Sequence, residues 1–502
     1  MTGSKRLCAA TLERLPSEVL RPSYPPQAAA IGVIHLGVGN FFRAHQAAYL
    51  DEAMDAGAVG WGICGVSLRN PATRDALSPQ DGYYSLIERD ADGDRIRIVG
   101  ALRELLVAQE DPARVVARIA APGTRWVTLT ITEKGYGHVA GGDRATLDVE
   151  HPDIAHDLAR PQAPRSAVGL LHAAIRMRRQ HRATPLTILS CDNLTCNGDL
   201  LRALVLQFDE ATGGGQAAWI DEHLRFPNTM IDRIVPRTGS AQRQFTADRL
   251  GVEDAWPVVT ERFRQWVIED RFAAGRPDWE AGGAILVDDV EPYELMKLRM
   301  LNGSHSMLAY AGFLAGMAYV RDAMADAVLA RLVRRHLAAA ASTLRPVAGI
   351  DLDDYTEALC RRFANPAIAH ETYQIAMDGT EKLPQRLLLP ALETLEAGGD
   401  IRPFAFAVAA WMRYCLGRRE NGSTYALRDP REARIAAIVA RDGGHPSALA
   451  SSLMAIDGLF PDRLRADADW KATVVGILAR MCEQGMAAAL SDEVGPPVAG
   501  GG

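Results

Sequence analysis

The fold is decided by residues 31–55, IGVIHLGVGNFFRAHQAAYLDEAMD. A short apolar run rich in β-branched residues ends in Gly37-Val38-Gly39, and a stretch with apolar residues at helical spacing follows it. A glycine pair between a strand and a helix lets backbone N–H groups approach a pyrophosphate at the helix N-terminus. The order of elements therefore predicts a dinucleotide-binding turn near the start of the chain.

This glycine motif is incomplete, because Phe42 occupies the position of the third glycine in GxGxxG. Taken alone, a GxG pair is also typical of a plain tight turn between strand and helix. Its place between a strand and a helix favours cofactor binding, with contacts from Gly37, Gly39, Asn40 and Phe41.

The second predicted strand ends in GVSLRNPATRD, where an Asp or Glu usually binds the adenosine ribose of NAD. Arg69 and Asn70 stand there instead, and Asp75 lies beyond the end of the strand. Because an arginine is able to receive a 2′-phosphate, Arg69 is a candidate cofactor contact. NAD is the predicted cofactor, and NADP stays open as the alternative.

Strand-like and helical stretches alternate from about residue 31 to 290. The strand-like runs are residues 31–39, 60–68, 95–102, 124–132 and 185–193, and the helical ones include residues 46–55, 113–120 and 167–179. After Pro292 the pattern is helical, as in residues 320–342 and 404–417. We therefore expect an α/β, Rossmann-type parallel-sheet domain over residues 1–290, a mostly α-helical domain over residues 291–493, and a disordered tail over residues 494–502.

Composition excludes several classes of protein. The chain has 502 residues and a net charge of −7, which argues against a nucleic-acid binder. No apolar run is long enough to span a membrane, no signal-peptide pattern opens the chain, and the seven scattered cysteines favour reduced thiols. We expect a cytoplasmic protein. No histidine or cysteine spacing predicts a metal, so side chains and an organic cofactor are expected to do the chemistry.

The strongest catalytic signal is PYELMKLRMLNGSHSMLAY, residues 292–310. On an α-helical wheel, Glu294, Lys297, Asn302 and His305 fall within an arc of about 140° on an otherwise apolar helix. Polar groups on a buried helix are costly unless they have partners or a function. Desolvation lowers the pKa of a lysine by several units, so a neutral Lys297 is a candidate general base.

In this interpretation Asn302 donates to the developing alkoxide and His305 holds a neighbouring hydroxyl. The alternative is structural: a buried Lys297 paired with Glu294 one turn away, and His305 as a core histidine. The nearby dinucleotide motif favours catalysis.

Three other stretches place polar residues in apolar surroundings. Asn193, after Asp192, is a candidate second donor to the alkoxide or part of an Asx turn. Asp232 and Arg233 interrupt an apolar run, either to bind substrate or as a buried ion pair. Lys382 follows the turn Asp378-Gly379, with Arg386 one turn later; these two are candidate contacts to substrate oxygens or surface cations.

Eight segments together resemble the long-chain polyol dehydrogenases, which include mannitol 2-dehydrogenases, D-arabinitol dehydrogenases and fructuronate reductases. They are HLGVGNFFRAHQAAYLD, LTITEKGY, SCDNLTCNG, FPNTMIDRIVP, FRQWVIEDRF, GRPDW, KLRMLNGSHS and DGTEKLPQRL. The resemblance runs from about residue 15 to 490 and implies a metal-independent, mostly NAD-dependent enzyme with its active site between a Rossmann-type and a helical domain.

Carried over by position, the resemblance makes Lys297 the general base and matches Asn193 and Asn302 to the pair that stabilises the alkoxide. It matches Asp232, His305 and Lys382 to substrate-binding positions. Mannitol-oxidising members carry an arginine four residues before the Asp of the DG turn, where this chain has Gln374. The segment therefore looks more like the fructuronate reductase branch.

The leading prediction is reversible reduction of D-fructuronate to D-mannonate, for whose carboxylate Lys382, Arg386 and Arg233 are candidate cations. Oxidation of D-mannitol to D-fructose is the alternative, and mannitol 1-phosphate is a lesser one. The YxxxK at Tyr293 matches a short-chain dehydrogenase motif, but the chain length and glycine pattern do not. A cofactor-sensing regulator would need no buried lysine. The resemblance suggests a monomer, without nucleic-acid or membrane partners.

Overall fold

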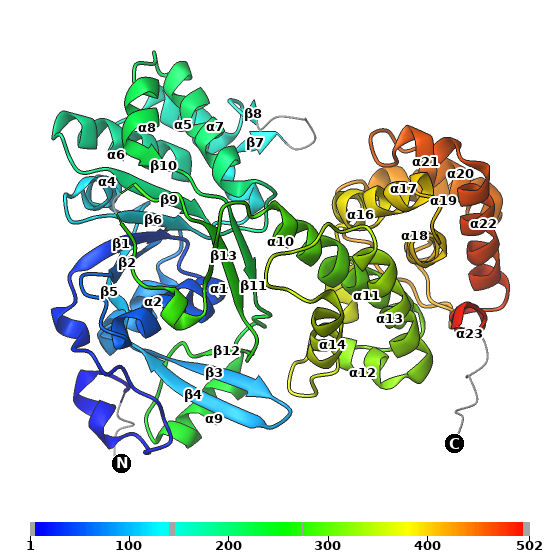
Figure 1. Ribbon diagram of the computed structural model, residues 1–502, viewed down its shortest axis with the longest axis horizontal. Coiled ribbons are helices and arrows are strands. Elements are labelled where there is room, and N and C mark those ends of the chain that lie inside the picture. The colour runs from blue at the N-terminus through cyan, green and yellow to red at the C-terminus, as the bar shows by residue number, and fades with distance from the viewer. Residues whose placement is uncertain (1–5, 140–145, 274, 495–502) are drawn as a thin grey trace. The chain divides into compact units, whose positions relative to one another are not determined.

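The computed structural model describes residues 6–139, 146–273 and 275–494. The chain divides into two compact units, Met1–Glu291 and Pro292–Gly502. The first unit is an α/β structure and the second is helical (Figure 1). Of the tail predicted over residues 494–502, all but the first residue lies outside the described part of the chain.

The core of the first unit is a six-stranded parallel sheet with the strand order β10-β9-β6-β1-β2-β5. Numbered along the chain within this sheet, the order is 3-2-1-4-5-6, that of a doubly wound dinucleotide-binding fold. The predicted Rossmann-type sheet is therefore confirmed. Its strands are β1 (Ile31–Leu36), β2 (Gly62–Ser67), β5 (Leu102–Val107), β6 (Trp126–Leu129), β9 (Leu186–Ser190) and β10 (Leu224–Arg225).

Side chains of alternate sheet residues enter two apolar cores. Ile34 and Val127 pack into the core that contains helices α4 (Pro112–Ala120), α6 (Ala167–Gln180) and α7 (Asn197–Ala211). Val33 and Trp126, one residue earlier in each strand, pack on α2 (Gln46–Asp55). The strands are thus buried on both faces, which explains their nearly continuous apolar sequences.

Two smaller three-stranded sheets complete the first unit. One has the order β11-β13-β14 and the other β12-β3-β4. Their strands are β3 (Tyr84–Asp90), β4 (Gly93–Val99), β11 (Thr229–Asp232), β12 (Val258–Glu261), β13 (Gln265–Glu269) and β14 (Ile285–Val287); β7 (His138–Val139) and β8 (Thr146–Leu147) form a further pair. The remaining helices are α1 (Asn40–Ala44), α3 (Ala72–Leu77), α5 (Pro152–Ala159), α8 (Ala217–His223) and α9 (Ser240–Leu250).

The sheet predicted for one strand was wrong. Residues 95–102 were expected to form one of the buried parallel strands, but β4 pairs antiparallel with β3 outside the six-stranded sheet, and β5 takes the place beside β2. Both segments contain apolar and charged residues, so the sequence alone does not say which one joins the parallel sheet.

The second unit has no strand among its described residues, only isolated bridges such as Tyr319 with Glu371. Its helices are α10 (Glu291–Met296, from the last residue of the first unit), α11 (Gly303–Leu314), α12 (Val320–Ala325), α13 (Ala327–Ala341), α14 (Leu352–Phe363), α15 (Thr372–Ala376), α16 (Gly379–Leu383), α17 (Leu389–Glu396), α18 (Arg402–Tyr414), α19 (Glu432–Asp442), α20 (Pro446–Met454), α21 (Asp462–Ala466), α22 (Ala468–Glu483) and α23 (Met486–Val494). Two π-helical segments, Lys297–Asn302 and Pro384–Leu388, interrupt them.

Helices α11 and α18 form the centre of the second unit. Every residue of α11 is buried, and α18 is buried along nearly its whole length. Residues 320–342, predicted to be helical, form two helices, because Asp326 separates α12 from α13. Its carboxylate accepts hydrogen bonds from the N–H groups of Val328 and Leu329, so it caps the second helix.

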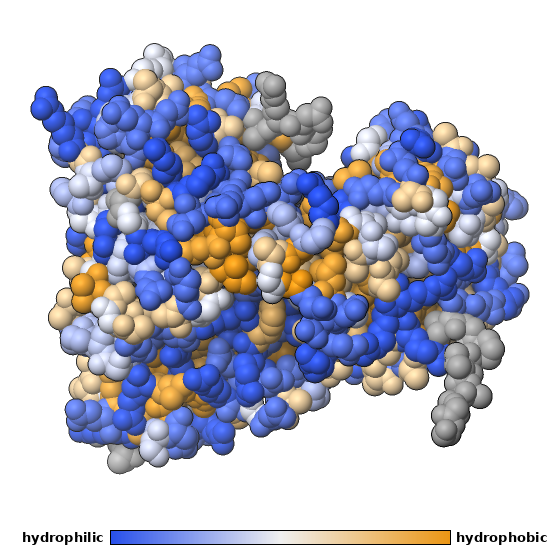
Figure 2. Space-filling model, viewed as in Figure 1, coloured by the Kyte–Doolittle hydropathy of each residue, from blue (hydrophilic) through white to orange (hydrophobic). Residues whose placement is uncertain are grey.

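Polar side chains cover most of the face that Figure 2 shows, with apolar areas between them. In the described residues, no helix combines the length and the apolar character that a membrane span requires.

Candidate functional site

Gly37 and Gly39 have different roles in the turn after β1. Gly37 has a φ of +104°, and a Cβ on it would lie 2.0 Å from the carbonyl oxygen of Thr130, so only glycine fits there. Gly39 has an ordinary extended conformation, and a Cβ on it would meet no atom within 4 Å. Since the fold does not require a glycine at position 39, its lack of a side chain is best explained by close approach of a ligand, which fits a dinucleotide pyrophosphate.

Phe42 takes the place of the third glycine because an aromatic stack fills that space. Its ring lies on the ring of His35 in β1, with 3.4 Å between the centroids. The helical stretch that follows is divided at His45 into α1 and α2, and α2 coincides with the stretch predicted over residues 46–55. Asn40 accepts a 2.6 Å hydrogen bond from Arg43, and the ring of Phe41 stacks on His45. These contacts fix the backbone that follows Gly39.

The two arginines that follow β2 are held by carboxylates. The guanidinium of Arg69 forms an ion pair with Asp153 of α5, and that of Arg74 pairs with Glu110 and Asp75. A cation that already has a carboxylate partner attracts a 2′-phosphate less strongly. This arrangement favours NAD over NADP.

Asp192 ties together two carboxyl ends of the parallel sheet. Its carboxylate accepts hydrogen bonds from the N–H groups of Ile131 (2.9 Å) and Thr132 (3.0 Å) and from the hydroxyl of Tyr136 (2.7 Å). The burial of Asp192 raises the pKa of this carboxyl, and the three hydrogen bonds act against that shift. Asp192 therefore joins two segments of the first unit, and its neighbour Asn193 is exposed at the edge of the sheet where ligands bind.

Asp232 and Arg233 are both buried at the end of β11. The guanidinium of Arg233 pairs with Glu88 and donates to the carbonyl oxygens of Glu261 and Ala44. Burial lowers the pKa of Arg233, and the charge of Glu88 acts in the opposite direction. These contacts show Arg233 as part of the core of the first unit.

In the second unit, Lys297 and Asn302 are the first and last residues of a π-helical segment. Residues five apart lie about 140° apart on an α-helix, whereas the i→i+5 pattern of a π-helix brings them towards the same face. Arg299, between them, is anchored elsewhere: its guanidinium donates to Glu393 of α17 and to the carbonyl of Thr343. These contacts fix the rotation of the segment about its helix axis. Lys297 is half-buried.

His305 lies one turn further on, in α11, and is 7% exposed. Its ring stacks on Phe363 (centroids 4.9 Å apart) and meets the ring of His370 edge-on at 4.8 Å. Its Nε2 atom is buried and has no hydrogen-bond partner among the described residues. Such an atom needs a ligand or water to satisfy it.

The pKa of His305 lies well below its usual range, first because of burial and then because of the nearby His370 and the cations Arg386, Arg362 and Lys382. His305 is therefore a neutral hydrogen-bonding group at neutral pH, in a positive electrostatic environment.

Lys382 is oriented by the backbone around the DG turn. Its ammonium donates to the carbonyls of Met377 (2.6 Å) and Ile375 (3.3 Å) and lies 4.0 Å from the carboxylate of Asp378. Gln374, which precedes this turn, is exposed. Lys382 and His305 thus belong to one charged neighbourhood within the second unit.

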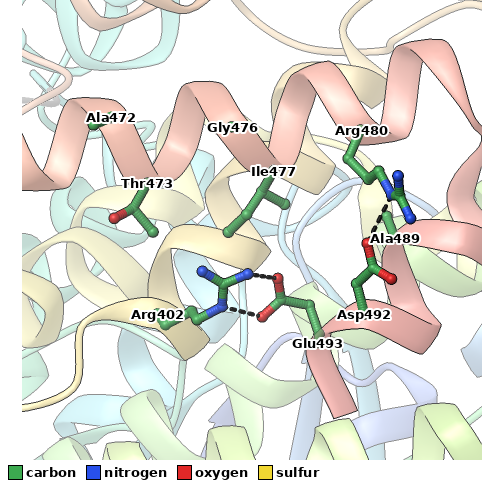
Figure 3. Close-up of a pocket in the computed structure, with 9 residues that line it drawn as sticks. All are labelled: Arg402, Ala472, Thr473, Gly476, Ile477, Arg480, Ala489, Asp492 and Glu493. Atoms are coloured by element: carbon green, nitrogen blue, oxygen red, sulfur yellow. Dashed lines mark hydrogen bonds and ion pairs between the residues drawn. The ribbon is translucent and has the colours of Figure 1, made fainter. Parts of the chain in front are cut away.

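A cavity of about 250 Å³ on the second unit is lined by none of these candidate residues (Figure 3). Its charged residues pair with each other: Arg402 with Glu493, and Arg480 with Asp492. Elsewhere in the described chain, no group of three or more His, Cys, Asp and Glu side chains is arranged to hold a metal ion.

The predicted residues form two sets, one in each unit. Gly37, Gly39 and Asn193 follow strands whose carboxyl ends share one sheet edge, and Asp232 ends β11 in a neighbouring sheet. Lys297, Asn302, His305 and Lys382 form the set of the second unit. His370 and Arg362 were not predicted as part of this set, because neither belongs to a motif or a periodic pattern.

A doubly wound sheet with a glycine turn, joined to a helical unit that contains Lys297, His305 and His370, defines a dinucleotide-dependent dehydrogenase. The model of the mannitol dehydrogenase Rossmann domain matches residues 31–281, and that of the mannitol dehydrogenase C-terminal domain matches residues 289–474. The chain belongs to the mannitol dehydrogenase family and is an oxidoreductase.

Three relatives illustrate the range of this family. A D-mannonate oxidoreductase of Escherichia coli is 41% identical over 93% of this chain and 96% of its own. A mannitol 2-dehydrogenase of Phaeosphaeria nodorum is 39% identical over 94% of this chain and 82% of its own. The structure of Pseudomonas fluorescens mannitol 2-dehydrogenase, a ternary complex with NAD and D-mannitol, is 36% identical, covers 98% of this chain and 100% of its own, and has a TM-score of 0.87.

Proposed function

We propose that the protein interconverts a secondary alcohol and a ketone on an open-chain sugar acid, with D-mannonate and D-fructuronate as its substrates and NAD as its cofactor. The observation that carries the reaction type is the π-helical segment that brings Lys297 and Asn302 towards one face, one turn before the buried His305. The similarity to D-mannonate oxidoreductase and the glutamine at position 374 favour the sugar acid over the polyol.

The cofactor would be held at the turn after β1, where the backbone from Gly37 to Phe41 leaves Gly39 open to a pyrophosphate. The ion pair between Arg69 and Asp153 favours NAD, and the homologous P. fluorescens enzyme was solved with NAD. Bound nicotinamide supplies the acceptor for the hydride that leaves the carbinol carbon.

The side chains of this chain manage the proton and the oxygens. Lys297, in its neutral form, takes the proton of the reacting hydroxyl. Asn193 and Asn302 donate hydrogen bonds to the oxygen as negative charge develops on it. His305, Asp232 and Lys382 bind the remaining oxygens of the substrate. Arg233, whose guanidinium is used within the first unit, acts on substrate only by positioning its neighbour Asp232.

Oxidation of D-mannitol to D-fructose is the second candidate, favoured by the likeness to the two mannitol 2-dehydrogenases. A comparison of kcat/KM for D-fructuronate and D-fructose with NADH, followed by the absorbance of the reduced cofactor, separates the two. We expect D-fructuronate to be the better substrate by at least tenfold. Equal or better use of D-fructose would overturn the sugar-acid assignment.

We further propose that the enzyme works as a monomer in the cytoplasm. The family resemblance supports a monomer, and the seven cysteines, which form no disulfide in the described part of the chain, fit a reducing compartment. Sedimentation of the purified protein tests the first point, because a dimer would have twice the chain mass.

A further inference from the structure

The second unit contains two neighbouring histidines, each with one buried ring nitrogen that no described residue engages. His305 has a buried Nε2 atom, and His370 a buried Nδ1 atom, that lack a hydrogen-bond partner among the described residues. Their rings are in edge-to-face contact, with centroids 4.8 Å apart and planes at 75°. Two buried polar atoms this close together indicate a ligand position rather than two unrelated defects of the core.

Three elements hold this pair in place. Phe363, the last residue of α14, stacks on His305, and Arg362 precedes it in the same helix. The backbone of His370 is fixed because its carbonyl accepts a 3.0 Å hydrogen bond from the N–H of Val320. The site is therefore built on ordered helices and a pinned loop, which is what precise binding of a small molecule requires.

Arg386 reaches the same neighbourhood from the second π-helical segment. Its Nη1 atom donates to Ser306 Oγ at 3.2 Å, and Ser306 is the residue next to His305 in α11. Ser306 in turn donates to the carbonyl of Asn302 at 2.9 Å. Arg386 is thus connected to both ends of the stretch that contains Asn302 and His305.

The charge of this neighbourhood suits an anion better than a neutral hydroxyl. Arg386, Arg362 and Lys382 all lower the pKa of His305, and Lys382 also lowers that of His370, after burial as the main cause; the pKa of His370 is about 4. Both imidazoles are therefore neutral donors at neutral pH, surrounded by cations. Arginine also matches the two oxygens of a carboxylate geometrically, which a single hydroxyl does not use.

We propose that His370 and Arg386, together with Arg362, form a subsite beside His305 that binds the carboxylate of the sugar-acid substrate. The subsite rests on the proposed function, since it explains how the enzyme prefers an acid to a polyol of the same length. Lys382, held by backbone carbonyls at the DG turn, adds to the positive field of the subsite.

Two variants test this subsite: Arg386→Gln, which keeps hydrogen-bonding capacity but removes the charge, and His370→Asn. We expect each to lower kcat/KM for D-mannonate at least 30-fold more than that for D-mannitol, because Arg386→Gln removes an ionic contact and His370→Asn a hydrogen-bond donor that only the carboxylate of the acid uses. Arg361→Gln is the matched control, since Arg361 is an exposed arginine next to Arg362 in α14. This control should leave the ratio of kcat/KM for D-mannonate to kcat/KM for D-mannitol unchanged.

If both substrates lose activity equally in folded Arg386→Gln, Arg386 is only a structural tie to Ser306 and the proposal is wrong. Should Arg386→Gln fail to fold, His370→Asn decides by the same ratio. An inhibition experiment separates this result from the choice of substrate. D-gluconate and sorbitol are compared as competitive inhibitors of whichever substrate the wild-type enzyme uses best.

The carboxylate subsite predicts that Arg386→Gln weakens D-gluconate at least tenfold more than sorbitol. Equal weakening of the two inhibitors would overturn the subsite. This outcome is independent of the proposed function, which fails instead if the wild-type enzyme prefers D-fructose to D-fructuronate.

Discussion

Gly303 and Arg386 bring two π-helical segments into contact through their backbones. A Cβ on Gly303 would lie 2.9 Å from the carbonyl oxygen of Arg386 and 3.3 Å from Nε2 of His336. Gly303 directly follows the segment that contains Lys297 and Asn302. The close approach therefore fixes the spacing between the candidate catalytic residues and the helical segments that contain Lys382 and Arg386.

Gly303→Ala should destabilise the protein by about 1–3 kcal/mol, because overpacking at a backbone contact outweighs the better helix propensity of alanine. Gly476→Ala is the matched control: this glycine is also inside a helix, α22, and a Cβ there meets nothing within 4 Å. The control should gain up to about 1 kcal/mol. Chemical unfolding measures both, and a neutral Gly303→Ala would show that the two segments separate easily.

The two glycines of the β1 turn should respond differently to alanine. Gly37→Ala places a Cβ 2.0 Å from a carbonyl oxygen at a positive φ, so we expect a loss of folded protein. Gly39→Ala should leave the melting temperature unchanged and raise the Kd of NADH at least tenfold, since the methyl group occupies the approach of the pyrophosphate. Titration of NADH against each folded variant is the measurement; unchanged affinity in Gly39→Ala would place the cofactor elsewhere.

Asp153→Asn should increase the use of NADPH. The change removes the carboxylate that pairs with Arg69, so the guanidinium becomes available to a 2′-phosphate. Because exposed ion pairs are worth about 0.2–1 kcal/mol, kcat/KM for NADPH should rise about two- to fivefold while that for NADH stays constant. Glu150→Gln, which removes the same charge from an exposed residue nearby, controls for net charge. A rise in both variants would contradict a specific role of Arg69.

His336 should make stability depend on pH. Burial lowers the pKa of this histidine from about 6.5 to about 4, and the weak 3.4 Å contact with the carbonyl of Pro403 acts in the opposite direction. Between these values the unfolded chain binds a proton that the folded chain does not. The free energy of unfolding therefore falls as pH decreases from 6.5 to 4, by about 1.4 kcal/mol per pH unit for this residue.

A His336→Gln variant tests this pH dependence. It should be less stable overall, because a well-packed buried ring is lost, but its unfolding free energy should fall less steeply over the same pH range. Urea unfolding at several pH values gives both slopes. Parallel curves for wild type and variant would show that His336 is already protonated, or remains neutral, in both states.

The order of the elements was largely predictable from the sequence, the candidate site residues stay predictions, and the errors have physical causes. The turn Gly37-Val38-Gly39 was predicted because its glycines lie between a strand and a helix, and the positive φ of Gly37 gives that glycine a local conformational reason. The π-helical segment was not, since it is an insertion into the hydrogen-bond pattern of a helix without a residue that marks it. An α-helical wheel therefore placed Lys297 and Asn302 farther apart than they are.

Long-range contacts explain the other differences. Arg233 resembled a candidate for substrate binding in the sequence, but Glu88, more than a hundred residues earlier, holds its guanidinium. His370 was not predicted as a site residue because its loop has no periodicity. Only the fold brings His370 into contact with His305. Contacts between residues far apart in the sequence determine the positions of both Arg233 and His370, and local sequence patterns do not reveal such contacts.

The most direct test of the mechanism is Lys297→Ala assayed with and without an added small primary amine such as methylamine. The account predicts a loss of at least about 10³-fold in kcat, an NADH Kd within about twofold of wild type, and partial recovery of the rate that grows with the concentration of neutral amine. A variant that keeps more than a tenth of the wild-type rate would show that Lys297 is not the proton acceptor.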